Sequence, residues 1–128
     1  MLPSGHVLLF DNGLARGWSR VLEVDPLRRE IVWEYRGDPP EMFFSSSRGS
    51  SQRLPNGNTL ITDSMIGRVF EVDPGGEIVW EFFDPRTRRR LFRLGRATIY
   101  RMTRLPHWPL EEQLSEDAED IESPAQQD

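Results

Sequence analysis

The sequence predicts an all-β fold built from two similar antiparallel units. Short segments alternate apolar with polar residues and are rich in β-branched and aromatic side chains, which is the pattern of strands. Tight-turn sequences separate these segments, as at Pro55-Asn56-Gly57 and Pro74-Gly75-Gly76, where proline presets a negative φ and glycine permits a positive one. The same succession of turns and strands then occurs a second time in the chain.

The two units match at three places. Residues 2–11 of the first unit correspond to residues 54–63 of the second. In the same way, residues 20–26 correspond to 68–74, and residues 30–35 correspond to 77–82. A third copy begins at Arg104-Leu105-Pro106 and stops, because His107-Trp108-Pro109 replaces the Asn-Gly turn. A period of roughly 50 residues with about four strands per unit indicates the blades of a β-propeller. The alternative is an open meander or sandwich of unrelated strands, and repetition at three matched places favours the propeller.

We therefore expect a partial β-propeller of two four-stranded blades, the start of a third, and a tail. Residues 1–49 form the first blade, which lacks its inner strand because Met1 directly precedes the Leu-Pro-Ser-Gly turn. Its expected strands are His6 to Phe10, Arg20 to Asp25 and Glu30 to Tyr35. Residues 50–96 form the second blade, with Ser50 to Arg53 as its inner strand. Residues 97–109 supply the inner strand of a further blade or a closing strand, and residues 110–128 form an acidic tail that is disordered or weakly helical.

Composition narrows the functional classes. The chain has no cysteine, which excludes disulfides and thiolate metal sites. No segment approaches the ~20 apolar residues of a membrane helix, and no basic start with an apolar core follows Met1. We therefore expect no metal, no membrane partner and no secretory signal in this chain.

Positive charge gathers in residues 84–104, whereas residues 111–122 are acidic and the net charge is −5. An arginine cluster of this kind is one signature of nucleic-acid binding. No aromatic platform is interleaved with it, however, and the overall balance is acidic. A solvated face, partly paired with the acidic tail, is the better interpretation, and no nucleic-acid partner is expected.

Residues 45–51 read Ser-Ser-Ser-Arg-Gly-Ser-Ser and leave two interpretations open. The segment is either a flexible surface loop or the rim of a propeller channel. At a channel rim, small polar side chains leave room for a ligand, and Arg48 supplies a fork of donors for an anion.

Several motifs together resemble the bacterial arylsulfotransferase family. They are Leu-Pro-Asn-Gly-Asn at 54–58, Phe-Glu-Val-Asp-Pro at 70–74 and Glu-Ile-Val-Trp-Glu at 77–81. The first unit carries Leu-Leu-Phe-Asp-Asn-Gly at 8–13 and Val-Trp-Glu-Tyr at 32–35 in the same order. The resemblance covers residues 2–106. Single blades also resemble propellers that bind quinone cofactors, but the order of motifs matches the C-terminal blades of the sulfotransferases.

The resemblance implies a six-bladed propeller whose funnel binds aryl sulfates. A histidine takes the sulfuryl group and passes it to a phenol without a nucleotide donor, and no cofactor is implied. Imidazole is a suitable nucleophile near neutral pH, and surrounding cations stabilise charge on the sulfate oxygens. The family is often exported, and the sequence leaves the location of this chain unknown.

The chain departs from the family at its histidines. The nucleophilic histidine would fall before Met1, and a second family histidine would fall near Gly49-Ser50, where no imidazole is present. His6 and His107 remain, and a polar residue at a turn explains His6 better than catalysis does. We expect no catalytic residue in this chain alone. The prediction is a truncated sulfotransferase-like piece that is inactive by itself, or alternatively a non-catalytic binding or scaffold module.

Four residues are the candidates for substrate binding. Asn12 and Arg16 lie in the loop that corresponds to the family's active-site rim, and Arg48 and Gln52 flank the expected inner strand. Each has a structural alternative: Asn12 as a turn former, Arg16 and Arg48 as solvated charges, and Gln52 as a strand-pairing side chain. The expected ligand is an aryl sulfate or a phenolic small molecule. Because two repeats leave long unpaired edges, the expected macromolecular partners are missing blades or further copies of the chain.

Overall fold

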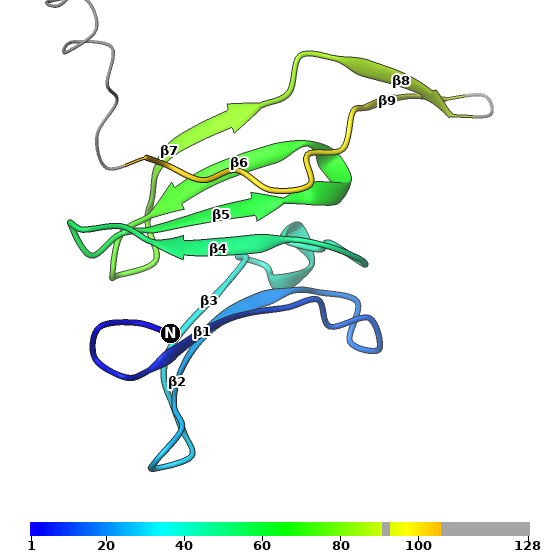
Figure 1. Ribbon diagram of the computed structural model, residues 1–128. Helices are drawn as coiled ribbons and strands as arrows, with labels where there is room; N and C mark the ends of the chain where they lie inside the picture. The colour runs from blue at the N-terminus through cyan, green and yellow to red at the C-terminus, as the bar shows by residue number, and fades with distance from the viewer. Residues whose placement is uncertain (91–92, 106–128) are drawn as a thin grey trace, which may run out of the picture.

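Two antiparallel sheets and a separate hairpin make up the fold (Figure 1). The computed structural model describes residues 1–90 and 93–105, with the backbone alone for residues 87–90 and 93–96. Sheet A contains β1 (Val7–Asp11), β2 (Arg20–Asp25) and β3 (Glu30–Arg36) in chain order. Sheet B contains β4 (Ser50–Arg53), β5 (Thr59–Asp63), β6 (Arg68–Val72) and β7 (Ile78–Phe83), also in chain order. The hairpin pairs β8 (Thr87–Arg90) with β9 (Arg93–Arg96).

The two sheets repeat each other down to their irregularities. β1 and β2 pair Phe10 with Val21, and β5 and β6 pair Thr62 with Val69, which are the equivalent positions of the repeat. Each sheet also has a register irregularity in its last pair of strands, after Glu23 in sheet A and after Glu71 in sheet B. A duplicated bulge indicates that the whole unit was copied, because bulges depend on local backbone geometry and not on hydrophobic pattern alone.

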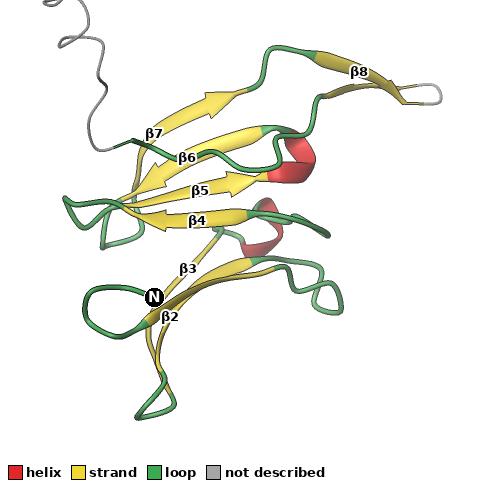
Figure 2. Cartoon of the chain, in the orientation of Figure 1, coloured by secondary structure: helices red, strands yellow, loops and turns green. Residues whose placement is uncertain are grey.

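Two short 3-10 helices lie at different places in the two units, one after the last strand of sheet A and one between β5 and β6 of sheet B (Figure 2). η1 spans Pro40–Met42 and η2 spans Ser64–Ile66. η2 ends at Gly67, which has a φ of +63° and whose amide bonds the Ser64 carbonyl. A side chain at Gly67 would overlap the carbonyl oxygen of Ala97, so glycine is required both by the dihedral angle and by the close approach of residue 97.

The main core lies between sheets A and B. Val21 and Tyr35 from sheet A and Ile61, Phe70 and Val72 from sheet B are buried there. Phe43, from the connection between the sheets, lies at the centre of this core. Its ring is within 5.7 Å of the ring centroids of Phe10, Tyr35 and Phe70. Edge-to-face aromatic packing of this kind fixes how one sheet is placed on the other.

A second, smaller cluster covers the opposite face of sheet B. Leu54, Leu60 and Val69 are buried there against Ile99 and Met102. Residues 97–105 therefore run across this face without forming a strand (Figure 1). Backbone bonds from Ile99 to Ser64 hold this segment to sheet B.

The all-β prediction is confirmed. The two sheets are open rather than closed, consistent with partial propeller blades, and the expected strands agree with the observed ones within one or two residues. The segment 97–102, expected as an inner strand, is extended but has no strand partner among the described residues. The β8–β9 hairpin was not anticipated within the arginine-rich stretch. The acidic tail and His107 lie outside the described residues, and the described part of the chain has no helix of the length and hydrophobicity needed to cross a bilayer.

Candidate functional site

A cavity of about 380 Å³ lies along the inner strand β4, and we call it the inner-strand cavity. Three chain segments contribute: β1, the residues 49–52 and the residues 101–103. The lining residues are Leu8, Phe10, Gly49, Ser50, Ser51, Gln52, Arg101, Met102 and Thr103. One wall is thus apolar, another carries hydroxyl groups, and Arg101 is the charged side chain. No carboxylate is among the described residues that line it, so the local charge favours an anionic ligand.

The serine-rich loop at the end of this cavity is ordered by Asn12. The Asn12 side-chain amide donates to the backbone carbonyls of Ser45 and Arg48. Ser19 adds a hydroxyl bond to the Asn12 carbonyl and receives the Ser45 amide. The flexible-loop interpretation of residues 45–51 is therefore less suitable than an anchored loop, because a buried serine pair and an asparagine hold its first half.

Arg48 lies in the same loop but is not among the residues that line the cavity. Its φ of +65° turns the chain sharply, and its guanidinium carbon lies 6.0 Å from the ring centroid of Tyr100. Gly49 follows with a φ of +126°, and a Cβ there would overlap the ring of Phe10. The two successive positive φ values bring the backbone close enough to form the apolar wall of the cavity.

The other two predicted residues are differently placed. Arg16 bonds Asp11 at 3.1 Å and lies 4.4 Å from the Trp18 ring centroid, so it closes its own loop. Gln52 lines the inner-strand cavity, and its side-chain amide makes two bonds to the backbone of Arg104, at 3.0 Å and 2.8 Å. Of the four predicted residues, Gln52 alone lines the inner-strand cavity, Asn12 and Arg48 are joined through the serine-rich loop beside it, and Arg16 is bonded to Asp11.

An ionic cluster joins each sheet to the segment that follows it, and we call it the Arg-Trp clamp. In sheet A, Glu23 bonds Arg53 at 2.8 Å, and the Arg53 guanidinium lies 5.2 Å from the Trp33 ring centroid. The His6 Nδ1–H donates to the carboxylate of the same Glu23 at 2.7 Å. Burial opposes ionisation of Glu23, but the bonds from His6 and Arg53 lower its pKa below the usual value. His6 is thus engaged with carboxylates and does not line the inner-strand cavity.

The same clamp recurs one repeat later. Arg104 bonds Glu71 and lies 5.4 Å from the Trp80 ring centroid, and Asn58 takes the place of His6 with a 2.8 Å bond to Glu71. Burial again opposes ionisation, whereas Asn58 and Arg104 lower the pKa of Glu71. Because asparagine fills the position of His6, the position requires a hydrogen-bonding side chain at a turn and not an imidazole.

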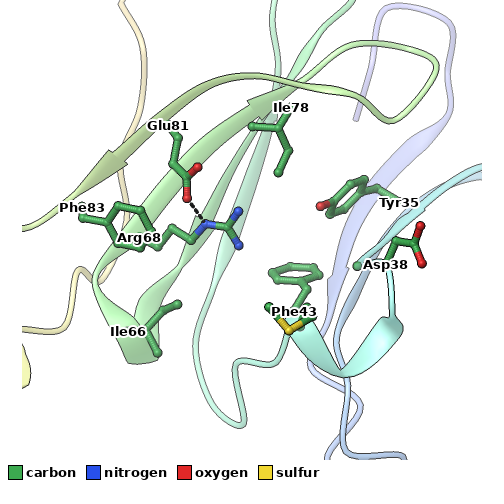
Figure 3. Close-up of a pocket in the computed structure, with 10 residues that line it drawn as sticks. Tyr35, Asp38, Phe43, Ile66, Arg68, Ile78, Glu81 and Phe83 are labelled. Atoms are coloured by element: carbon green, nitrogen blue, oxygen red, sulfur yellow. Dashed lines mark hydrogen bonds and ion pairs between the residues drawn. The ribbon is translucent and has the colours of Figure 1, made fainter.

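A second cavity of about 380 Å³ opens between the outer parts of the two sheets (Figure 3). Tyr35 and Phe43 form one side, and Ile66, Ile78 and Phe83 form the other. Figure 3 shows the Arg68 guanidinium extending between these sides, with its Nε bonded to Glu81 at 2.8 Å.

Arg68 breaks the symmetry of the repeat. Its counterpart Arg20 bonds both Asp11, at 2.9 Å, and Glu34, at 3.7 Å. The bond from Arg20 is the main reason that the pKa of Asp11 is lowered. In the second repeat, the counterpart of Asp11 is Asp63, which is 1 % exposed and has no hydrogen-bond partner for either oxygen within the described residues. Desolvation by burial raises the pKa of Asp63 to about 6, and the charge of Arg68 and the nearby backbone amide of Met65 only partly oppose this shift.

The fold and the cavities define a class before any comparison: a repeated all-β protein whose neighbouring sheets are joined by arginine clamps around a small anion-compatible cavity. A family model described as Arylsulfotransferase (ASST) matches residues 4–85, which is more than half of the chain. The chain belongs to this family. No curated protein and no solved structure matches it.

Sequence reasoning missed Arg101 as a cavity residue and Asp63 as an unpartnered carboxylate. Arg101 lies in the expected inner strand 97–102 and in an Ile-Tyr-Arg motif that fits the resemblance, and these were the signals that could have singled it out of the basic stretch. Asp63 had a signal, because its counterpart Asp11 and both flanking arginines are visible in the repeat alignment. The difference between the two repeats, however, depends on where the Arg68 side chain points.

Proposed function

We propose that the inner-strand cavity binds a small aromatic anion of the aryl sulfate type, with phenols as weaker ligands. The observation that supports this is the lining, which combines Arg101 and hydroxyl groups with the apolar side chains of Leu8, Phe10 and Met102 and has no carboxylate among the described residues. A sulfate group requires charge-assisted hydrogen bonds, and an aryl ring requires an apolar wall. Membership of the arylsulfotransferase family agrees with this ligand class.

We further propose that a single copy of this chain does not transfer the sulfuryl group. The transfer implied by the family needs a histidine to attack sulfur while the aryl oxygen leaves as a phenol. Among the described residues the one histidine is His6, which is bonded to Glu23 and lies 3.8 Å from Asp25. An imidazole held between two carboxylates at a turn, outside the cavity, has no access to a ligand bound there.

A binding titration with para-nitrophenyl sulfate tests the first proposal. Arg101→Gln removes the cationic side chain of the cavity, and we expect binding to weaken by about 10- to 150-fold, since a charge-assisted bond contributes about 1.5–3 kcal/mol. Arg28→Gln is the matched control, because Arg28 is 77 % exposed in the turn between β2 and β3. Equal binding by the wild type and both variants, or no binding by the wild type, contradicts the proposal.

A colorimetric assay for release of para-nitrophenol in the presence of phenol tests the second. We expect no turnover. Turnover that His6→Gln abolishes would show that this imidazole carries the group, and our account of the missing nucleophile would be wrong. The remaining alternative, a binding or scaffold module without aryl sulfate affinity, is favoured if neither binding nor turnover is detected while the exposed sheet faces still engage a partner.

A further inference from the structure

The far face of sheet B is incompletely covered, and the repeat shows what is missing. Tyr35 of sheet A is 7 % exposed because sheet B packs over it, whereas its counterpart Phe82 is 37 % exposed. Trp80, the counterpart of the clamp residue Trp33, is 40 % exposed. The same chemical surface is therefore buried by a following sheet in the first repeat and open in the second.

The face of sheet A that points away from sheet B is also exposed, and β1 is an edge strand with one unpaired side within the described residues. Ile61 on β5 is fully buried, whereas its counterpart Leu9 on β1 is 44 % exposed. β5 pairs with strands on both sides, β4 and β6, but β1 pairs with β2 alone within the described residues. Sheet A thus lacks both a neighbouring sheet on one face and the strand that β4 supplies to sheet B.

Residues 101–104 are the counterpart of β4 one repeat later in the chain. The Arg-Trp clamp places Arg104 on Glu71 and Trp80 as it places Arg53 on Glu23 and Trp33. Since Arg53 is the last residue of β4, residues 101–104 lie on sheet B as β4 lies on sheet A. They have no strand partner of their own among the described residues.

We propose that sheet A of a second copy of this chain packs on the far face of sheet B, with residues 101–104 pairing as an added strand along its β1. The interface reproduces the contact between sheets A and B within one chain, so it needs no surface that the chain does not already use. A head-to-tail contact of this kind leaves the same two surfaces free at each end until a ring closes. With two sheets per copy and 4–8 blades in closed propellers, the ring contains about 2–4 copies.

The pairing register follows from the repeat. β4 pairs Ser51 with Ile61 and Gln52 with Leu60 in sheet B. The equivalent intermolecular pairs are Met102 with Leu9 and Thr103 with Leu8. Side chains of paired residues in antiparallel strands point to the same face. The pair of Met102 and Leu9 should therefore lie on one side of the new sheet, facing sheet B.

Engineered cysteines test this register directly, because the chain has no cysteine of its own. Leu9→Cys protein mixed with Met102→Cys protein should form a disulfide heterodimer under mild oxidation. Leu9→Cys mixed with Thr103→Cys is the matched control, since a shift of one residue moves the side chain to the other face of the strand. Equal crosslinking by the two mixtures, or none by either, overturns the proposed pairing.

Light scattering after size-exclusion provides the second measurement. We expect the full chain to elute at two to four times 14.9 kDa, and Phe82→Glu to elute as a monomer. Leu27→Glu, at a turn position that is 94 % exposed, should leave the mass unchanged. A wild-type chain that is monomeric at high concentration and melts cooperatively refutes the inference, whatever the result of the aryl sulfate titration. An assembly that persists in Phe82→Glu and fails to crosslink would show that copies meet through another surface.

Discussion

The buried carboxylate of Asp63 makes a quantitative prediction. Its pKa is raised from 3.8 to about 6, so the folded chain binds this proton more tightly than the unfolded chain does. Each pKa unit corresponds to about 1.4 kcal/mol, so a shift of about two units corresponds to about 3 kcal/mol. Ionised Asp63 therefore destabilises the fold by up to this amount above pH 6, and the destabilisation disappears as the pH falls below 4.

Asp63→Asn keeps the shape of the side chain and removes its charge. We expect the variant to unfold at higher urea concentration than the wild type at pH 7.5, with a gain of up to about 3 kcal/mol. The gain should shrink through pH 6 to 4 and vanish below pH 4. Urea titrations followed by tryptophan fluorescence at several pH values measure this difference.

Asp11→Asn is the control with the opposite sign. The bond from Arg20 lowers the pKa of Asp11, so ionised Asp11 stabilises the fold. Its replacement should therefore destabilise the chain at pH 7.5, with the difference fading as the pH falls through the lowered pKa. If Asp63→Asn also destabilises at pH 7.5, then Asp63 is paired as an anion in solution, and the asymmetry between Arg20 and Arg68 is not real.

Two further predictions concern packing. Phe43→Ala should destabilise the chain by about 3–5 kcal/mol in urea titrations, because this fully buried ring lies at the centre of the inter-sheet core, whereas exposed Met42→Ala should change little. Gly49→Ala should destabilise it by about 1–3 kcal/mol and weaken aryl sulfate binding, because φ is +126° there and the new methyl group overlaps Phe10. If Phe43→Ala leaves the free energy of unfolding unchanged, the core does not depend on this ring. If Gly49→Ala leaves it unchanged, the loop backbone relaxes to accept the methyl group.

Most of the strands could be predicted from the sequence, because each strand is an alternating segment between turn residues and each segment occurs twice. The residues of the Arg-Trp clamp also recur, since Glu23, Trp33 and Arg53 correspond to Glu71, Trp80 and Arg104, but their mutual contacts were not predicted from the sequence. The sequence did not show which partner each charged side chain contacts. Arg20 and Arg68 are in equivalent positions and both contact the carboxylate of the third repeated strand, Glu34 or Glu81, but Arg20 also bonds Asp11, whereas Arg68 makes no such bond to Asp63. The Arg68 guanidinium extends instead into the cavity lined by Tyr35 of sheet A and by Phe43 from the connection between the sheets.

The candidate site was only partly predictable for a similar reason. Gln52 and Arg48 were predicted because they flank an inner strand, whereas Arg101, although it lies in the expected inner strand 97–102, was assigned to the solvated basic stretch. Its position follows from the path of residues 97–105, and that path is fixed by backbone bonds to Ser64 and Thr62. Hydrogen bonds from the main chain of a segment without strand pairing leave no periodic pattern in a sequence.

The duplicated Arg-Trp clamp has a consequence for how such chains evolve. Each unit supplies the glutamate and the tryptophan of a clamp from its own strands. The arginine of that clamp comes from the segment that follows the unit in the chain. A chain that gained or lost one whole unit would therefore keep the same arginine, glutamate and tryptophan contacts at each junction between units, without a new contact having to arise.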